Sequence, residues 1–197
     1  MARNNTNNNK RALMGVLLVL LLMGCYACYE LLLVPALRGS TLIDNPTAKA
    51  ITVGIDDKVY NVPARSFEKI HLSEGHHRIN CKEHNITDQD LDLDPTAFGV
   101  INPTQSKYVI YNIIYSEKNL KSQFKPYMVE GREVYSMLGE PEVTTALFIP
   151  DRTLGKGNID DKAPSVKDYN RLNQDYSFLT KIFRLNDFFD FYDKNNQ

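Results

Sequence analysis

Residues 50–81 read AITVGIDDKVYNVPARSFEKIHLSEGHHRINC, and this stretch decides the fold class. Every second residue from Ile51 to Ile55 is apolar, which predicts a strand with one buried face. Residues 56–58 (DDK) are typical of a turn, and residues 59–62 (VYNV) read as the returning strand. The stretch therefore opens with an antiparallel hairpin.

The second part of the same stretch predicts another hairpin. Residues 67–72 and 76–81 each alternate in apolar character, and they flank the short loop Ser73-Glu74-Gly75. A glycine in a short loop between two such runs is a hairpin signal. We therefore expect the strands 67–72 and 76–81 to pair with each other.

Strand patterns continue through the middle of the chain. The run 107–115 (KYVIYNIIY) is rich in β-branched and aromatic residues, which favour strands. Further strands are expected at residues 98–101, at 127–129 paired with 132–137, and at 146–149, and residues 44–46 (DNP) read as a turn. Short strands at this spacing predict an antiparallel β-sandwich-like domain over residues 45–150.

The region 50–81 also resembles small bacterial extracytoplasmic β-modules of the PEGA and carboxypeptidase-regulatory-like kind. Their pattern is a strand, a polar turn, a returning strand, a small-residue step and a closing leucine, glycine and histidine. Leu72, Gly75 and His76 occupy those closing positions. The resemblance covers about thirty residues and implies an accessory β-fold rather than a reaction.

In the C-terminal part of the sequence, the spacing of the apolar residues changes. Residues 151–164 hold glycine, proline and charged residues and read as a loop. Residues 165–193 are predicted to be a C-terminal helical segment, in which Asn186 ends or kinks the helix, because apolar residues recur every three or four positions on one amphipathic face. That face consists of Val166, Tyr169, Leu172, Tyr176, Leu179 and Phe183. The expected class is thus α+β.

Aromatic residues crowd the end of this segment. They are Phe188, Phe189, Phe191 and Tyr192. A short element cannot easily bury so many rings, and exposed apolar patches mark partner sites. We therefore take these four residues as a possible partner surface.

An apolar run near the N-terminus predicts a membrane anchor. Residues 12–37 contain one charge, Glu30, and a bilayer core needs about 20 apolar residues in a helix. Lys10 and Arg11 precede the run, so the positive-inside bias predicts a cytoplasmic N-terminus. The asparagine-rich residues 1–11 read as a disordered cytoplasmic tail, and residues 38–44 as a linker to a domain on the outer side.

A second interpretation of the same run stays open. The residues Leu22-Met23-Gly24-Cys25 follow a basic start and a short apolar stretch, which is the layout of a secretory signal ending at residue 24. They also resemble a bacterial lipoprotein signal, in which Cys25 would be lipidated. If the run is an uncleaved helix, Glu30 becomes a candidate for contact with a partner helix, because an acid inside a membrane segment is expensive.

Charge and cysteine content argue against two classes of protein, those that bind nucleic acid and those stabilised by disulfides. Beyond residue 40, acidic residues outnumber basic ones by four and both signs are interspersed. Such a surface is a poor polyanion binder, so nucleic acid is not expected as a partner. Cys25 and Cys28 lie in the apolar run, which leaves Cys81 alone in the remainder and no disulfide framework there.

All four histidines lie between positions 71 and 84. His71, His76 and His84 are metal-ligand candidates, since a transition metal needs three or four converging ligands. The spacing matches no zinc motif. We predict no bound metal or cofactor.

Acidic residues alternate at 88, 90, 92 and 94, which hints at calcium. An EF-hand needs glycine at its sixth position and an acid at its twelfth, and neither register provides both. The alternation instead predicts the charged edge of a sheet.

These features predict a non-catalytic, membrane-anchored accessory or scaffolding protein of the cell envelope, which presents a β-domain for protein–protein interaction. It would be a single-pass protein of the cell membrane with its domain periplasmic or extracellular. The alternative is an envelope enzyme or metal-binding protein that uses the region from His71 to His84.

Overall fold

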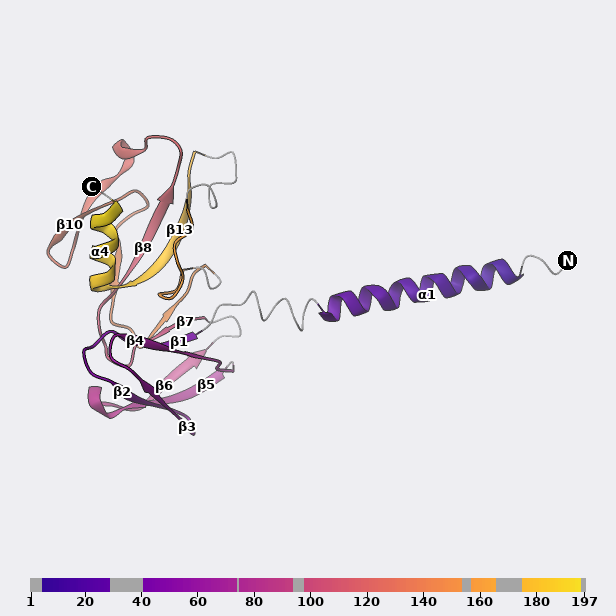
Figure 1. Cartoon of the computed structure of the whole chain (residues 1–197), viewed down its shortest axis with the longest axis horizontal. Coiled ribbons are helices and arrows are strands. Elements are labelled where there is room, and N and C mark those ends of the chain that lie inside the picture. Colours follow the sequence, from indigo (N-terminus) through magenta and orange to yellow (C-terminus); the bar gives the residue numbers. More distant parts are fainter. Residues whose placement is uncertain are drawn as a thin grey trace. The chain divides into compact units, whose positions relative to one another are not determined.

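The computed structural model describes residues 5–28, 41–73, 75–93, 98–153, 157–165 and 175–195. The chain divides into two compact units, residues 1–38 and residues 39–197. The described part of the first unit is the helix α1 (Asn5–Cys28), which begins inside the segment predicted to be a disordered tail. The described part of the second unit is mostly β-strands in several sheets with one helix (Figure 1). The chain is therefore α+β and rich in strands.

The first half of the second unit forms one antiparallel sheet and two strands of another. In the sheet order β3-β2-β5-β6, the predicted hairpin of β2 and β3 is confirmed. The elements are β1 (Thr41–Asn45), β2 (Ile51–Ile55), β3 (Lys58–Val62), β4 (Ser66–Ile70), β5 (Gly75–Cys81), a 3-10 turn (Lys82–His84) and β6 (Ile86–Leu93).

The predicted pairing of β4 with β5 is wrong. β4 pairs antiparallel with β1, whereas β5 pairs with β2 and β6. The competing partner is β1, which covers residues expected to be a linker and the start of a turn. All five β1 residues are buried, and each of them pairs with a β4 residue, from Thr41 with Ile70 to Asn45 with Ser66.

The second half of the unit contains the long strand β8 and a C-terminal strand–helix pair. The predicted hairpin of β9 and β10 is confirmed. The elements are β7 (Gly99–Ile101), β8 (Tyr108–Tyr115), a 3-10 turn (Lys121–Gln123), β9 (Lys125–Val129), β10 (Arg132–Ser136), β11 (Glu142–Thr144), β12 (Phe148–Pro150), β13 (Ser177–Arg184) and α4 (Leu185–Asn195).

The helical segment predicted over residues 165–193 is wrong up to residue 184 where the structure describes it, and Asn186 lies near the start of α4 instead of ending a helix. Residues 177–184 form β13, which pairs with β8 along its whole length, and the helix α4 begins only at Leu185. Leu179 and Phe183 lie in the core beneath α4, while Ile182 packs into a different cluster on the other face of the strand. A strand buried on both faces carries apolar residues at mixed intervals, which here imitate the helical period. Residues 166–174 lie outside the described residues.

A central sheet joins the two halves. Its order is β12-β7-β1-β4, and β1 and β7 run parallel at its middle. It lies between the β3-β2-β5-β6 sheet and the sheet of β8 and β13 (Figure 1). On one face of the central sheet, Ile43 and Ile101 pack into the hydrophobic core with residues of β2, β3, β5 and β6. On the opposite face, Val100 packs with Ile110 and Ile182. The unit is thus layered around one shared sheet.

Helix α4 covers the outer face of β8 and β13. Val109, Tyr111 and other odd-numbered β8 residues pack beneath it, while Tyr108 and Ile110 face the central sheet. β8 therefore reads as a nearly continuous apolar run because both of its faces are covered.

Candidate functional site

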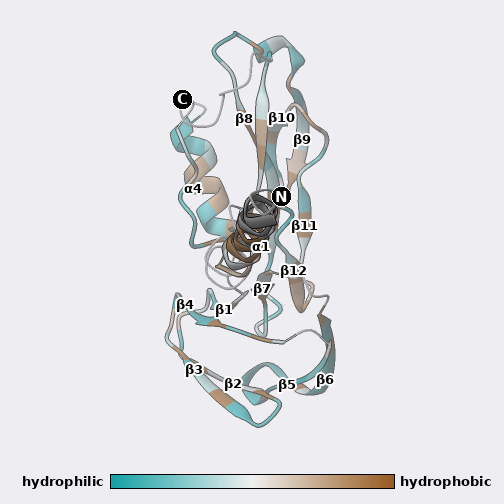
Figure 2. Cartoon of the chain, turned by 90° about the vertical axis from the view of Figure 1, so that its right-hand side faces the viewer, coloured by the Kyte–Doolittle hydropathy of each residue, from teal (hydrophilic) through white to brown (hydrophobic). Residues whose placement is uncertain are grey.

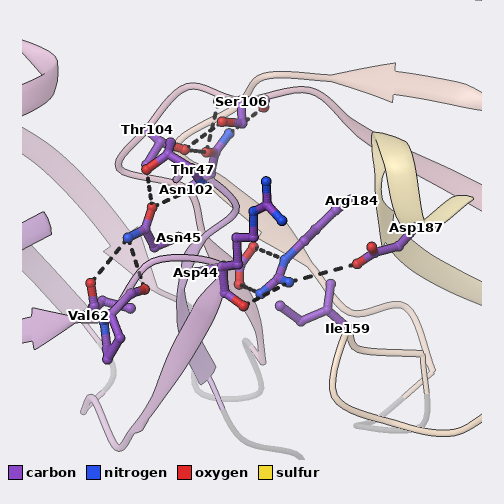
Figure 3. Close-up of polar contacts among 12 residues, drawn as sticks. Asp44, Asn45, Thr47, Val62, Asn102, Thr104, Ser106, Ile159, Arg184 and Asp187 are labelled. Carbon is purple, nitrogen blue, oxygen red and sulfur yellow. Dashed lines mark hydrogen bonds and ion pairs between the residues drawn. The ribbon is translucent and has the colours of Figure 1, made fainter. Parts of the chain in front are cut away.

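The junction between the two halves is built on a buried carboxylate. Asp44 on β1 is fully buried, and its two oxygens are bonded by Tyr108 of β8 and Arg184 of β13. Figure 3 shows Arg184 directed at the Asp44 carboxylate. The Tyr108 hydroxyl donates to Oδ2 at 2.5 Å. Arg184 donates from Nε to Oδ2 at 2.9 Å and from Nη2 to Oδ1 at 2.5 Å. A buried charge needs this kind of bidentate pairing to be tolerated.

The electrostatics of the junction favour a structural role. Burial, followed by the charge of Asp44, raises the pKa of Tyr108 far above its usual value. The hydrogen bond to Asp44 likewise raises the pKa of Arg184. The tyrosine therefore stays a neutral donor and the arginine a cation, so the three groups form a fixed network rather than an acid–base pair.

Two copies of the tripeptide Asn-Pro-Thr flank this network. One starts at Asn45, the last residue of β1, and the other at Asn102, just after β7, the parallel neighbour of β1. In each copy the asparagine Oδ1 accepts from the threonine hydroxyl two residues on, at 2.7 Å for Thr47 and 3.0 Å for Thr104.

The amide groups of these asparagines donate to backbone carbonyls. Asn45 Nδ2 reaches Lys49, Val62 and Pro63 at 2.7–3.1 Å, and Asn102 Nδ2 reaches Ser106 and Ala146 at 2.9 and 3.3 Å (Figure 3). Both side chains are fully buried. They hold equivalent loops at the same end of the central sheet, and the repeated tripeptide is the sequence signal that would have found them.

A polar cleft of about 620 Å³ opens beside the junction. The loops after the two tripeptides and the first turn of α4 line it. Its charged lining residues are Arg65, Lys107, Arg184, Asp187 and Asp190. Lys107 is paired with Glu130 at 2.5 Å and Arg184 with Asp44, so the two cations are already neutralised. Arg65, Asp187 and Asp190 are the remaining charged groups, so the cleft carries charges of both signs.

The three histidine candidates lie on separate elements. His71 is exposed after β4, His84 ends a 3-10 turn, and His76 lies on β5, which is not the partner of β4. His76 contacts Asp92 at 2.9 Å and Asp90 at 3.2 Å across the β5–β6 pair. Within the described ranges, no group of three or more histidine, cysteine, aspartate or glutamate residues is arranged to hold a metal ion.

The buried histidine is one that the sequence did not single out. His77 is 6% exposed, and its Nδ1 lies 2.7 Å from Asp56 Oδ2 while its Nε2 lies 2.9 Å from the Ser73 carbonyl. Alternation along β5 could have identified it, because His77 shares a face with the buried Ile79 and Cys81.

The acidic alternation at residues 88–92 lies on β6, the edge strand of its sheet, as predicted. Asp88, Asp90 and Asp92 are exposed there. The fourth residue of the pattern, Asp94, lies outside the described residues.

The proposed aromatic partner surface is wrong for two of its four residues. Phe188 is fully buried and Tyr192 nearly so, because α4 turns them onto β8 and β13. The Phe188 ring lies 5.3 Å from that of Tyr111. Phe189 and Phe191 are partly buried, and the Arg132 guanidinium stacks 4.5 Å above the Phe189 ring. Phe188 and Tyr192 therefore belong to the core rather than to a free patch.

Exposed apolar side chains occur instead on the ribbon of β9 and β10. Met128 is 61% exposed and Tyr135 44% exposed, and both point away from the buried Val129 and Val134. The backbone of Tyr135 is bonded to two tyrosine hydroxyls, Tyr192 at its N–H and Tyr111 at its C=O. The outer edge of β10 is thus covered while the face of the ribbon stays open.

Consecutive large apolar side chains of α1 from Val16 to Met23 are exposed, and the helix is coloured as hydrophobic along this part (Figure 2). Cys25 and Cys28 are exposed on it. Among the residues that the structure describes, no helix combines the length and the apolar character that a membrane crossing requires. The predicted anchor extends to Leu37, and Glu30 lies outside the described residues.

The fold and the junction define a β-rich protein of two halves locked across a shared central sheet. No protein-family model matches this sequence, and comparisons with curated proteins and with solved structures found no match. The resemblance of residues 50–81 to extracytoplasmic β-modules therefore stays a prediction.

Proposed function

We propose that this chain is a membrane-tethered accessory or scaffolding protein of the cell envelope, which presents its β-rich unit for contact with other proteins. The observation that carries the proposal is the surface of α1. Its large apolar side chains from Leu13 to Met23 are each 55–72% exposed. A helix segment that is apolar all round needs an apolar environment to cover it, and the apolar run continues beyond the described end of the helix to Leu37 with one charge, Glu30.

Membrane attachment is tested by fractionation. The full chain should stay with the membrane pellet after an alkaline carbonate wash, and a variant without residues 1–38 should be found in the supernatant. Leu18→Arg, which places a charge in the middle of the apolar run, should weaken attachment, whereas Asn61→Arg on the exposed part of β3 should not. Release of the full chain by the wash would contradict the proposal.

The proposed orientation has the N-terminus in the cytoplasm and the β-rich unit outside. Protease added to spheroplasts should then digest the β-rich unit. A mass measurement separates the two forms of anchor, because a lipoprotein would lack the first 24 residues and carry lipid on Cys25. Protection of the β-rich unit from protease would contradict the orientation.

Contact with other proteins is tested on the face of the β9–β10 ribbon. The proposed occupant of this face is a protein of the same membrane assembly, since apolar side chains held in a rigid ribbon suit a protein interface. The double variant Met128→Glu with Tyr135→Glu should abolish co-purification of partners in mild detergent. Val59→Glu, at a residue 68% exposed on β3, is the matched control. Equal loss in both variants, or a wild-type chain that purifies without partners, would count against the ribbon.

A further inference from the structure

The start of β5 joins two segments that are separate in sequence. The β2–β3 turn reaches it through Asp56, and the segment after β4 reaches it through Ser73. Asp56 and Arg78 form a reciprocal pair, in which the Asp56 N–H donates to the Arg78 carbonyl at 2.9 Å and the Arg78 N–H donates to Asp56 Oδ1 at 2.9 Å. The second oxygen of the same carboxylate faces His77. Asp56 has a φ of +51°, a conformation that aspartate tolerates in turns.

The two neighbours of the His77 ring are both hydrogen-bond acceptors. Nδ1 faces the Asp56 carboxylate and Nε2 faces the Ser73 carbonyl. A neutral imidazole has one N–H, so it can satisfy one of these acceptors but not both. The imidazolium has two N–H groups and satisfies both. The ring is buried, so water has little access to the nitrogen that lacks a proton, whereas the Asp56 side chain is 46% exposed and can be hydrated once it is released.

Among the described charged groups near His77, Asp56 is the one whose side chain faces the ring. Leu91 lies opposite His77 on β6. Arg78 and His76, the neighbours on β5, direct their side chains to Asp90 and Asp92 of β6. In the turn, Asp57 and Lys58 are exposed. His76 also lies between two acceptors, but its side chain is 52% exposed, so water can serve either nitrogen.

We propose that His77 is a proton-operated latch, which in its charged form ties the Ser73 segment and the β2–β3 turn to the start of β5 and which releases one of them when it loses its proton. The device is independent of the proposed membrane attachment. It lies at one end of the β3-β2-β5-β6 sheet, so opening it would free the end of that sheet without disturbing the Asp44 junction.

The expected titration follows from the same contacts. Burial alone would lower the pKa of His77, but the hydrogen bonds to Asp56 and Ser73 and the charge of Asp56 outweigh it, so the pKa is raised. The hydrogen bond from His77 lowers the pKa of Asp56. The latch is therefore fully closed between the ordinary pKa of aspartate, about 4, and that of histidine, about 6.5. It weakens as the pH rises through the raised pKa of His77, and it weakens in acid as Asp56 becomes protonated.

The experiment is an NMR titration of the histidine ring protons in the full chain, combined with amide hydrogen exchange. His77 should titrate above pH 6.5. Over the same pH interval either the Asp56 and Arg78 amides or the amides of the segment after β4 should lose protection, beyond the rise of intrinsic exchange. Asp56→Asn keeps the turn geometry and removes the charge, so it should shift the His77 midpoint downward. His71→Gln, at an exposed histidine, should leave both readings unchanged.

Two outcomes would overturn the latch. One is a His77 midpoint at or below 6.5 in the wild-type chain. The other is amide protection that changes neither at Asp56 and Arg78 nor in the segment after β4 through the His77 titration. A far-UV circular dichroism spectrum of Asp56→Asn that matches the wild type shows that the variant has folded, and a downward shift measured in that folded variant supports the proposal.

Discussion

Asp44 shows how a single residue can hold distant parts of the chain together. It lies 140 residues from Arg184, yet both of its oxygens are bonded and it has no exposed surface. Sequence reasoning placed Asp44 in a linker and turn, because Asp-Asn-Pro is a common turn signal. Its side-chain partners, Tyr108 and Arg184, lie 64 and 140 residues away in sequence and leave no local pattern.

Replacing Arg184 by methionine tests this role. The change leaves the Asp44 carboxylate buried without its charged partner, which should reduce the free energy of unfolding by about 3–5 kcal/mol. Urea unfolding of the full chain measures it. Adding Asp44→Asn to the same variant should recover part of the loss, because it removes the uncompensated charge.

The control for Arg184→Met is Lys118→Met, which breaks the exposed ion pair between Lys118 and Asp175. Exposed pairs contribute little, so this variant should unfold at nearly the wild-type urea concentration. Similar losses of unfolding free energy in both variants would show that burial of the Asp44–Arg184 pair does not determine its contribution to stability.

Lys181 should make the stability of the protein depend on pH. Its ammonium is buried and donates to the carbonyls of Asn158 and Asp161. Burial lowers the pKa of Lys181, although nearby aspartates act in the opposite direction. Between the lowered pKa and the unfolded value near 10.4, the unfolded chain binds more protons, so stability should rise with pH.

The measurement for Lys181 is the difference in free energy of unfolding between wild type and Lys181→Met from pH 7 to pH 10. Taking the difference removes the contribution of tyrosines, which titrate in both proteins. The wild type should gain stability relative to the variant as the pH increases. A constant or falling difference would contradict the direction of the shift.

At the scale of elements, the sequence predicted strands more reliably than their partners. The expected strands at 51–55, 59–62 and 107–115 are confirmed, since alternation and β-branched content are local properties. The pairing of β4 with β1 and the parallel pair of β1 and β7 join residues far apart in sequence, and nothing local encodes them. The helix expected before residue 184 does not form, because eight residues there pair with β8. This pairing stabilises a strand despite the apparent helical spacing of the apolar residues.

The packing of helix α4 on β8 and β13 can be tested at Phe188. Phe188 is fully buried and touches the rings of Tyr111, Phe183 and Tyr192. Phe188→Ala should therefore reduce the free energy of unfolding by about 3–5 kcal/mol, as for other buried phenylalanines. Val59→Ala on an exposed face is the control and should have little effect. Unchanged stability in Phe188→Ala would restore the idea that this aromatic cluster is a free partner surface.

For the whole molecule, the shared central sheet predicts that the two halves of the β-rich unit unfold together. β1 and β7 pair in parallel, and the Asp44–Arg184 contact crosses from the first strand of the unit to its last. Because each half loses one face of its core if the central sheet opens, neither half is expected to survive alone. The unfolding of the unit should be a single transition.

The two halves carry separate reporters that make this testable. Cys81 is buried in the core of the first half, and burial raises its pKa, so its thiol should react only when that half opens. Most tyrosines lie in the second half and report on it through near-UV circular dichroism, since the chain has no tryptophan. In a Cys25→Ser and Cys28→Ser background, Cys81 labelling and the tyrosine signal should change at the same urea concentration. Labelling of Cys81 at a clearly lower concentration would show that the first half opens alone and that the central sheet does not couple the halves.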